Sequence, residues 1–207
     1  MCFSAPASFV AAGGLTALGG ASIVIAKKEN KILALIPILF AFQQAFEGVQ
    51  WIYLKLGSTS LFAGYAYVFF AFIVWPVYVP LFVFIVDKKK RRILKWFLFL
   101  GIATALYFAI LFLTQSLAIH QIKSCIAYSF TFPFRNIANG GYLIAVFGPL
   151  FISSRENFKF FGVAIAALAI IAWIFFTTTF VSVWCFFAAI VSSLFFVYLK
   201  KGRVLPK

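Results

Sequence analysis

Long apolar runs separated by short polar connections follow one another along the whole 207-residue chain. An apolar run of about 20 residues is long enough to cross the hydrocarbon core of a bilayer as an α-helix. The pattern predicts helices at 7–26, 32–54, 61–86, 93–114, 139–153, 160–176 and 177–199, with a tight turn between the last two. We therefore expect an all-α integral membrane bundle of seven helices that forms one transmembrane domain.

Composition supports the bilayer as the solvent of this chain. Hydrophobic residues make up 65% of the sequence and charged residues 11%, and the mean hydropathy is +1.08. A soluble domain normally has roughly a quarter charged residues and about half apolar ones. A soluble core of this size could not bury so much apolar surface, so we expect the lipid bilayer to be the main partner.

Basic residues are distributed unevenly between the two sides of the predicted bundle. Of the 18 lysines and arginines, only Lys55, Lys123 and Arg135 do not fall beside the ends of the first, third, fifth and seventh segments. Cytoplasmic connections carry such an excess of basic residues. The pattern predicts a cytoplasmic C-terminus and a periplasmic or extracellular N-terminus, and in a bacterium this corresponds to the inner membrane. It also accounts for the net charge of +14 without nucleic acid, because no nucleic-acid-binding motif accompanies the clusters.

Short matches suggest an internal repeat. The stretch GGLTALGGASIVIAKKEN, from Gly13, resembles GGYLIAVFGPLFISSREN, from Gly140, and QWIYL and VWPVYVP have counterparts in AWIFF and VWCFFAA. The order of the matches indicates two parallel three-helix halves joined by the fourth segment. Transporters built from such repeats place their sites between the halves. Chance matches between helices rich in Phe and Ala are the alternative explanation.

The second segment contains the most unusual stretch, FQQAFEGVQW, residues 42–51. Gln43, Glu47 and Trp51 are four residues apart and share one helical face with Gln44, while Gly48 permits close approach of another helix. A charged carboxylate at the bilayer centre costs roughly 2.5–3.5 kcal/mol or more, so Glu47 must face the bundle or an aqueous cavity. It is either a ligand-binding or proton-coupling acid, or a protonated acid that links helices by hydrogen bonds.

Aromatic residues on two other segments are candidates for the opposite walls of a pocket. Pro76 and Pro80 interrupt the hydrogen bonding of the third segment beside Trp75 and Tyr78, and the freed carbonyl groups need a partner or a cavity. Ser182, Trp184 and Cys185 lie in the seventh segment at a depth similar to that of Glu47. We expect Trp51, Trp75, Tyr78 and Trp184 to line the pocket, although packing is the commoner role of aromatic residues in membrane helices.

Catalytic chemistry would depend on few residues. His120, the single histidine, lies in the connection before the fifth segment, and Cys2, Cys125 and Cys185 are the cysteines. A thiol at Cys2 or Cys185 would need His120 and Glu47 to be gathered around it by the fold. Cys2 and Cys125 fall on the same predicted side, where a disulfide is an option in an oxidising compartment.

Motifs for metals and cofactors are missing from the sequence. It contains no CxxC, no HExxH and no histidine cluster, which argues against zinc or haem. It also lacks a Walker motif, a Rossmann fingerprint and a GxSxG elbow. We therefore expect neither a metal nor a cofactor.

The motifs MCFSAPASF, FAFQQAFEGVQW, VWPVYVP and FVSVWCFFAAIVS span nearly the whole chain. On these motifs the chain resembles an uncharacterised family of bacterial seven-helix membrane proteins that begin Met-Cys-Phe-Ser, and the stretch from His120 to Tyr128 is similar to that family too. The resemblance implies no established activity. In architecture alone the chain is similar to the PQ-loop superfamily, including SWEET sugar carriers, although it has no Pro-Gln dipeptide and no proline in the middle of its first segment.

These patterns favour one function over two alternatives. The favoured hypothesis is the binding or transport of a small solute in a polar and aromatic pocket around Glu47, Gln43 and Gln44, with coupling to protons. The first alternative is a membrane enzyme that acts on a lipid or quinone-like substrate at the outer face. The second is a membrane sensor or assembly factor. No pattern in the sequence indicates an oligomeric state.

Overall fold

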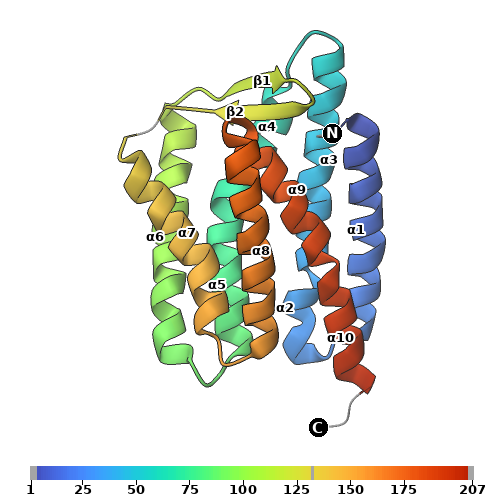
Figure 1. Ribbon diagram of the computed structural model, residues 1–207, viewed down its shortest axis with the longest axis vertical. Coiled ribbons are helices and arrows are strands. Elements are labelled where there is room, and N and C mark those ends of the chain that lie inside the picture. The colour runs from blue at the N-terminus through green and yellow to red at the C-terminus, as the bar shows by residue number, and fades with distance from the viewer. Residues whose placement is uncertain (1–3, 132, 205–207) are drawn as a thin grey trace. The chain divides into compact units, whose positions relative to one another are not determined.

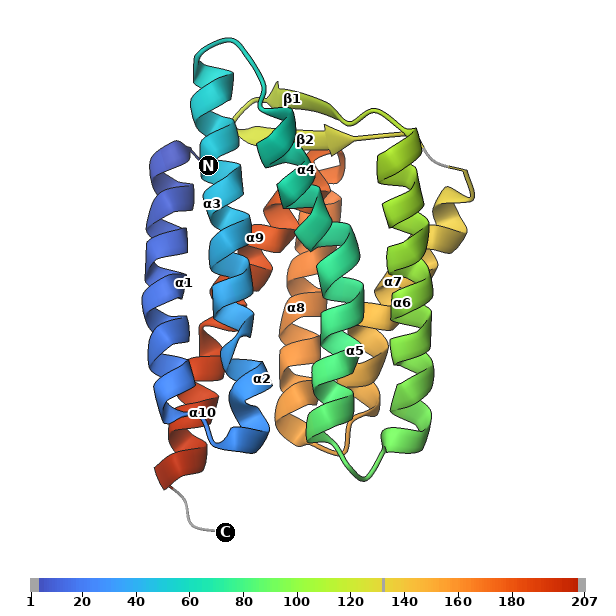
Figure 2. The ribbon, with the colours of Figure 1, turned by 180° about the vertical axis from the view of Figure 1, so that it is seen from behind.

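The computed structural model describes residues 4–131 and 133–204, with side chains described as far as Lys200 (Figures 1 and 2). Helices make up most of the chain, and a single β-hairpin interrupts them between α6 and α7. The elements are α1 (Ala5–Ile25), η1 (Lys28–Asn30), α2 (Lys31–Ala34), α3 (Ile36–Lys55), α4 (Leu61–Phe69), η2 (Phe70–Val74), α5 (Trp75–Val86), α6 (Arg91–Thr114), β1 (Ala118–Ile122), β2 (Cys125–Ser129), α7 (Arg135–Ile152), α8 (Glu156–Phe175), η3 (Thr177–Thr179), α9 (Phe180–Ser192) and α10 (Leu194–Val204).

Within the described residues, six helical stretches are long and apolar enough to cross a membrane. They are Ala5–Ile25, Lys28–Lys55, Leu61–Val86, Arg91–Thr114, Glu156–Phe175 and Thr177–Lys200. These bounds lie within a few residues of six of the predicted segments. The seventh prediction, 139–153, corresponds to α7, an 18-residue helix that is not among the six. Its first turns, RNIANGG, are polar, which leaves too short an apolar stretch.

The chain divides into two compact units. The first unit combines the chain up to Tyr67, the hairpin residues Ile119–Tyr128 and the chain from Leu168 onward. The second unit combines Val68–Ala118 with Ser129–Ala167. The first unit therefore joins the beginning and the end of the sequence, and the predicted repeat of two consecutive three-helix halves stays a prediction.

Close helix packing organises the first unit. Ser4 caps α1, where its hydroxyl accepts a hydrogen bond from the Ala7 amide at 3.4 Å, and α1 runs beside α3 (Figures 1 and 2). A Cβ atom at Gly48 would stand 2.9 Å from the ring of Phe9 on α1, closer than carbon atoms pack. The prediction that Gly48 permits close approach of a neighbouring helix is confirmed.

The hairpin was predicted only as a connection. Its two strands are joined by a tight turn in which Lys123 has a left-handed backbone, with φ of 55°. The β2 residues from Cys125 to Tyr128 are buried, whereas most of β1 is exposed. The β2 strand is therefore an integral part of the first unit rather than a solvated loop.

A π-helical segment shapes the second unit. It is η2, which lies directly before Trp75 and Pro76, and π-helical turns widen the backbone and free carbonyl groups. The hydroxyl of Tyr142 on α7 donates a hydrogen bond to the Ala71 carbonyl at 2.8 Å. The sequence predicted freed carbonyl groups in this segment, and a tyrosine from another helix satisfies one of them.

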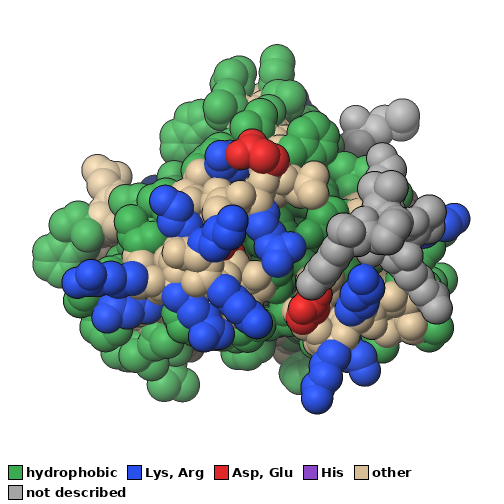
Figure 3. All heavy atoms as spheres, turned by 90° about the horizontal axis from the view of Figure 1, so that it is seen from below, with side chains coloured by type: hydrophobic (Ala, Val, Ile, Leu, Met, Phe, Trp, Pro, Cys, Tyr) green, Lys and Arg blue, Asp and Glu red, His purple; other side chains and the backbone are tan. Residues whose placement is uncertain are grey.

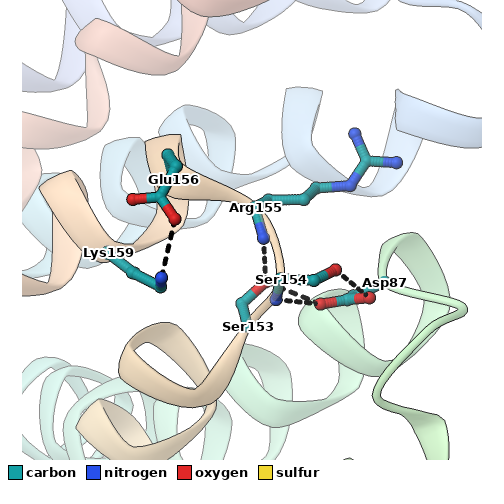
Figure 4. A network of polar contacts seen from close by, with 6 residues as sticks. All are labelled: Asp87, Ser153, Ser154, Arg155, Glu156 and Lys159. Carbon is teal, nitrogen blue, oxygen red and sulfur yellow. Dashed lines mark hydrogen bonds and ion pairs between the residues drawn. The ribbon is translucent and has the colours of Figure 1, made fainter.

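Asp87 links two connections of the second unit through hydrogen bonds (Figure 4). It is 2% exposed, and its carboxylate accepts hydrogen bonds from the Ser153 hydroxyl at 2.8 Å and from the Ser154 amide at 2.6 Å. The Ser154 hydroxyl at 2.8 Å and the Lys89 amide at 3.1 Å also donate to it. The α5–α6 and α7–α8 connections therefore meet around one saturated carboxylate.

These two connections also carry many of the predicted cytoplasmic basic residues. The run from Lys88 to Arg92 follows α5, and Arg155 and Lys159 follow α7. Lysine and arginine side chains gather on the face shown in Figure 3. The cytoplasmic location of these residues and the orientation of the chain in a membrane stay predictions.

Gly101 provides a test of helix packing in the second unit. A Cβ at this position would lie 1.9 Å from the backbone oxygen of Pro76. We expect Gly101→Ala to cost at least about 1–3 kcal/mol of unfolding free energy, because the clash is with backbone. The matched control is Gly140→Ala, where a Cβ meets nothing within 4 Å. Unfolding in detergent would measure both, and equal effects would contradict the close contact.

The Asp87 network predicts acid-sensitive stability. Burial alone would raise the pKa of this carboxyl group, but hydrogen bonds from Ser154, Ser153 and the Lys90 amide bring it below its usual value. The ionised Asp87 carboxylate therefore contributes its full stabilisation at pH values above the pKa of Asp in the unfolded chain, about 3.9. This stabilisation is lost as the pH falls through the lower pKa that the group has in the folded state. Asp87→Asn should remove this dependence and cost about 1.5–3 kcal/mol at neutral pH.

Denaturant unfolding between weakly acidic and strongly acidic pH would check this expectation. The control is Glu156→Gln, because the Glu156 side chain is 83% exposed in its pair with Lys159 and exposed pairs contribute little. An Asp87→Asn variant with the wild-type pH profile would contradict a stabilising role for the carboxylate.

Candidate functional site

A group of polar residues on α3 is completely buried inside the first unit. Gln43, Gln44, Glu47 and Gln50 each have 0% exposure. Their spacing of three or four residues places Gln43, Glu47 and Gln50 along one side of the helix, the side that packs against other parts of the unit. We call these four residues, together with the groups that contact them, the Glu47 cluster.

The Glu47 carboxylate receives its clearest hydrogen bond from α9. The hydroxyl of Ser182, also 0% exposed, donates to Oε1 of Glu47. Gln44 lies against the same carboxylate, but neither atom of its amide forms a hydrogen bond of normal geometry. The second carboxylate oxygen, Oε2, is buried and has no hydrogen-bond partner among the described residues.

Tyr67 and Cys185 extend the cluster. The Tyr67 side chain is fully buried, and its hydroxyl lies 3.5 Å from the carbonyl oxygens of Val181 and Ser182. The Cys185 thiol contacts both Gln43 and Tyr67. The polar groups of α3 thus meet side chains from α4 and α9, which come from distant parts of the sequence.

Tyr128 brings the hairpin into the cluster. Its ring stacks on Tyr67, with 4.6 Å between the ring centroids and 11° between the planes. Burial, and then the negative charge of nearby Glu47, raise the pKa of the Tyr128 hydroxyl well above its usual value. The hydroxyl therefore stays protonated and available as a donor, yet it is buried without a hydrogen-bond partner in the described chain.

Two other residues of α3 have buried polar atoms without a hydrogen-bond partner in the described chain. Gln50 uses its oxygen to accept a hydrogen bond from the Ser60 amide at 3.2 Å, which leaves its Nε2 without a partner, and the indole nitrogen of Trp51 has none either. A buried polar group that lacks its hydrogen bond costs about 1–3 kcal/mol. Several of the buried polar atoms without a hydrogen bond in the described chain therefore belong to α3, the helix that carries Glu47.

No basic side chain compensates Glu47 within the described residues. The side chains that lie against its carboxyl group, Ser182 and Gln44, are uncharged. The lysines of the first unit, such as Lys27 and Lys55, lie at the ends of helices. The cluster therefore carries either no charge or a single negative charge, depending on whether Glu47 holds a proton.

The aromatic residues Trp75, Tyr78 and Trp184, predicted to line the pocket, do not all belong to the same unit. Trp184 is buried on α9 and stacks on Phe180, with 5.2 Å between ring centroids. Trp75 and Tyr78 belong to the second unit, where their rings meet edge to face at 6.3 Å. Gln43, Gln44, Glu47 and Cys185 are thus brought together, whereas a place for Trp75 and Tyr78 beside Glu47 stays a prediction.

Two of the candidate catalytic residues differ in their exposure. His120 is exposed on β1, whereas Cys185 is 5% exposed. Cys2 lies outside the described residues, and so does its suggested pairing with Cys125. Across residues 4–131 and 133–204, no group of three or more His, Cys, Asp or Glu side chains could hold a metal ion.

Sequence reasoning did not select three members of the cluster. Gln50 follows Gln43 by seven residues, so helical periodicity places it on the Glu47 side of α3 and could have identified it. Tyr67 is one of two tyrosines in the apolar run FAGYAYVFF, and nothing local separates it from Tyr65. Tyr128 belongs to the family-like stretch near His120, but only the folded hairpin places it on Tyr67.

A pair of hydroxyl deletions tests the hydrogen bonding of the cluster. Ser182→Ala should lower the free energy of unfolding by about 1–3 kcal/mol, because it leaves Glu47 Oε1 without its donor. Tyr128→Phe removes a buried hydroxyl that has no partner and should be neutral or slightly stabilising. Unfolding of both variants in detergent without added solute would measure the contrast. Equal losses in the two variants would contradict the assigned hydrogen bonds.

Comparison with known proteins identifies the family. The profile of the family described as "Family of unknown function (DUF6629)" matches residues 1–206, and the chain belongs to this family. No curated protein and no solved structure matches the chain significantly.

Proposed function

We propose that this member of the DUF6629 family is a multi-pass membrane protein that binds a small polar solute at Glu47 and couples its movement to protonation of that residue. We further propose that it resides in a bacterial inner membrane with its N-terminus outside and its C-terminus in the cytoplasm. The family assignment itself implies no activity, so the proposal depends on the chemistry of the Glu47 cluster.

The observation that carries the proposal is the unsatisfied oxygen of a fully buried carboxylate. Glu47 Oε2 has no partner in the described chain, and neither have Gln50 Nε2, Trp51 Nε1 and the Tyr128 hydroxyl. A carboxyl group that only links helices would be expected to have all of its hydrogen-bonding atoms paired, because unsatisfied buried polar groups are costly. A binding site has reason to keep them open, because a solute and the water that enters with it supply the missing partners.

A role for the proton follows from the same burial. A charged carboxylate in an apolar helix bundle is costly, and no basic side chain in the described chain faces Glu47. Taking up or releasing one proton therefore changes the charge of the whole cluster. A solute that prefers one protonation state binds in linkage with the proton, which is the requirement for coupled movement.

The enzyme alternative receives less support. A thiol nucleophile needs a base beside it, but the hydrogen-bonding neighbours of Cys185 are Gln43 and Tyr67. His120 is exposed on β1, apart from the buried thiol. No contact among the described residues specifically supports the alternative of a sensor or assembly factor.

Infrared spectroscopy of the purified protein in lipid tests the proposed site. We expect a protonated carboxyl band that disappears in Glu47→Gln, shifts promptly in D₂O because water reaches the site, and gives way to carboxylate bands as the pH rises. Glu156→Gln is the control, because it removes an exposed acid and should leave this band unchanged. A Glu47 band that neither exchanges in D₂O nor titrates would identify a sealed structural acid and reject the proposal.

A further inference from the structure

We propose that the solute is a small organic cation with N–H donors, a protonated amine or a guanidinium group, and that it exchanges with the proton of Glu47. This inference rests on the proposed function and adds the chemical class of the solute and the direction of coupling. It commits to exchange of the cation against a proton, not to movement of both in the same direction.

The distribution of acids in the chain is the first support. The sequence has only four acidic residues, and three of them lie at connections or helix starts. Glu29 is in η1, Asp87 is saturated by hydrogen bonds, and Glu156 pairs with Lys159 at 2.7 Å. Glu47 alone lies within an apolar helix and has no cationic partner in the described chain. A cationic solute would supply the missing counter-charge.

The second support is the set of acceptors that remain open. Glu47 Oε2 and Gln44 Oε1 are buried acceptors without a hydrogen-bond partner in the described residues, and they belong to side chains that contact each other. Two adjacent acceptors suit a solute that carries more than one N–H donor. The ionised carboxylate repels an anionic solute and attracts a cationic one.

Aromatic rings near the carboxylate provide the third support. Tyr128 interacts electrostatically with Glu47 and stacks on Tyr67, and Trp51 follows Glu47 by one helical turn and is 3% exposed. The faces of such rings attract ammonium and guanidinium groups, and more strongly where water is excluded. A carboxylate close to a tyrosine ring is a combination that recognises organic cations.

The charges of the groups around Glu47 explain why the cation should exchange with a proton. The titratable groups that interact with it electrostatically are Tyr67 on α4, Tyr128 on β2 and Cys185 on α9, and their protonated forms are neutral. Glu47 alone therefore sets the charge of the cluster. Binding of one cation to protonated Glu47 releases one proton, and the cluster is neutral before and after the exchange.

Guanidinium and urea form a matched pair of probes, because they have the same planar shape and differ in charge. We expect millimolar guanidinium to convert the Glu47 acid band in infrared difference spectra to carboxylate bands, and urea to have no such effect. The conversion should be absent in Glu47→Gln and retained in Glu29→Gln, which removes an acid from η1.

Vesicles that contain the full chain and a pH-sensitive dye add a measurement of flux. Inward guanidinium movement in exchange for protons should raise the internal pH, and Glu47→Gln should reduce this change to that of protein-free vesicles. No change in pH with the wild-type protein, or acidification of the interior, would overturn the exchange.

The outcomes separate this inference from the proposed function. If urea alters the acid band and guanidinium does not convert it, the site takes neutral solutes and the cation class is wrong. If neither probe acts but the band exchanges in D₂O, the cation inference fails while the water-accessible site stands. If the band does not exchange in D₂O at all, both proposals fail.

Discussion

Burying a carboxylate among apolar helices is expensive unless every one of its hydrogen-bonding positions is used, and the first unit is built around such a group. Glu47 has one oxygen bound by the Ser182 hydroxyl and one oxygen without a partner in the described chain. Its hydrogen-bond donor comes from α9, and Tyr67 on α4 and Tyr128 on β2 interact with it electrostatically. The two ends of the sequence and the hairpin belong to this same unit.

The buried acids of the two units differ in how completely their carboxylates are hydrogen-bonded. In the second unit, hydroxyl and amide donors from two connections saturate the Asp87 carboxylate (Figure 4), as expected of a structural clasp. In the first unit, Glu47 is surrounded by donors and acceptors that do not complete its hydrogen bonding. The contrast within a single chain is the physical reason why we propose a structural role for Asp87 and a binding role for Glu47.

Apolar runs and basic clusters were sufficient to predict most of the helices, because the cost of an exposed polar backbone in lipid leaves few alternatives. The polar face of α3 was predictable for the same reason, since a run such as FQQAFEGVQW must turn its polar side inward. The hairpin was not, because AIHQI and CIAYS are short and become strands only through packing on the first unit. Nor could the sequence show that Tyr142 meets the Ala71 carbonyl or that Tyr67 meets Tyr128, since these contacts join distant residues.

An experimental structure of the protein in lipid, at a resolution that shows ordered water, tests the central claim most directly. The claim is that the hydrogen bonding of Glu47 is completed by something other than the protein. We predict ordered water or solute density within hydrogen-bonding distance of Glu47 Oε2. A dry carboxylate, with Oε2 bonded only to neighbouring side chains such as Gln44, would contradict it.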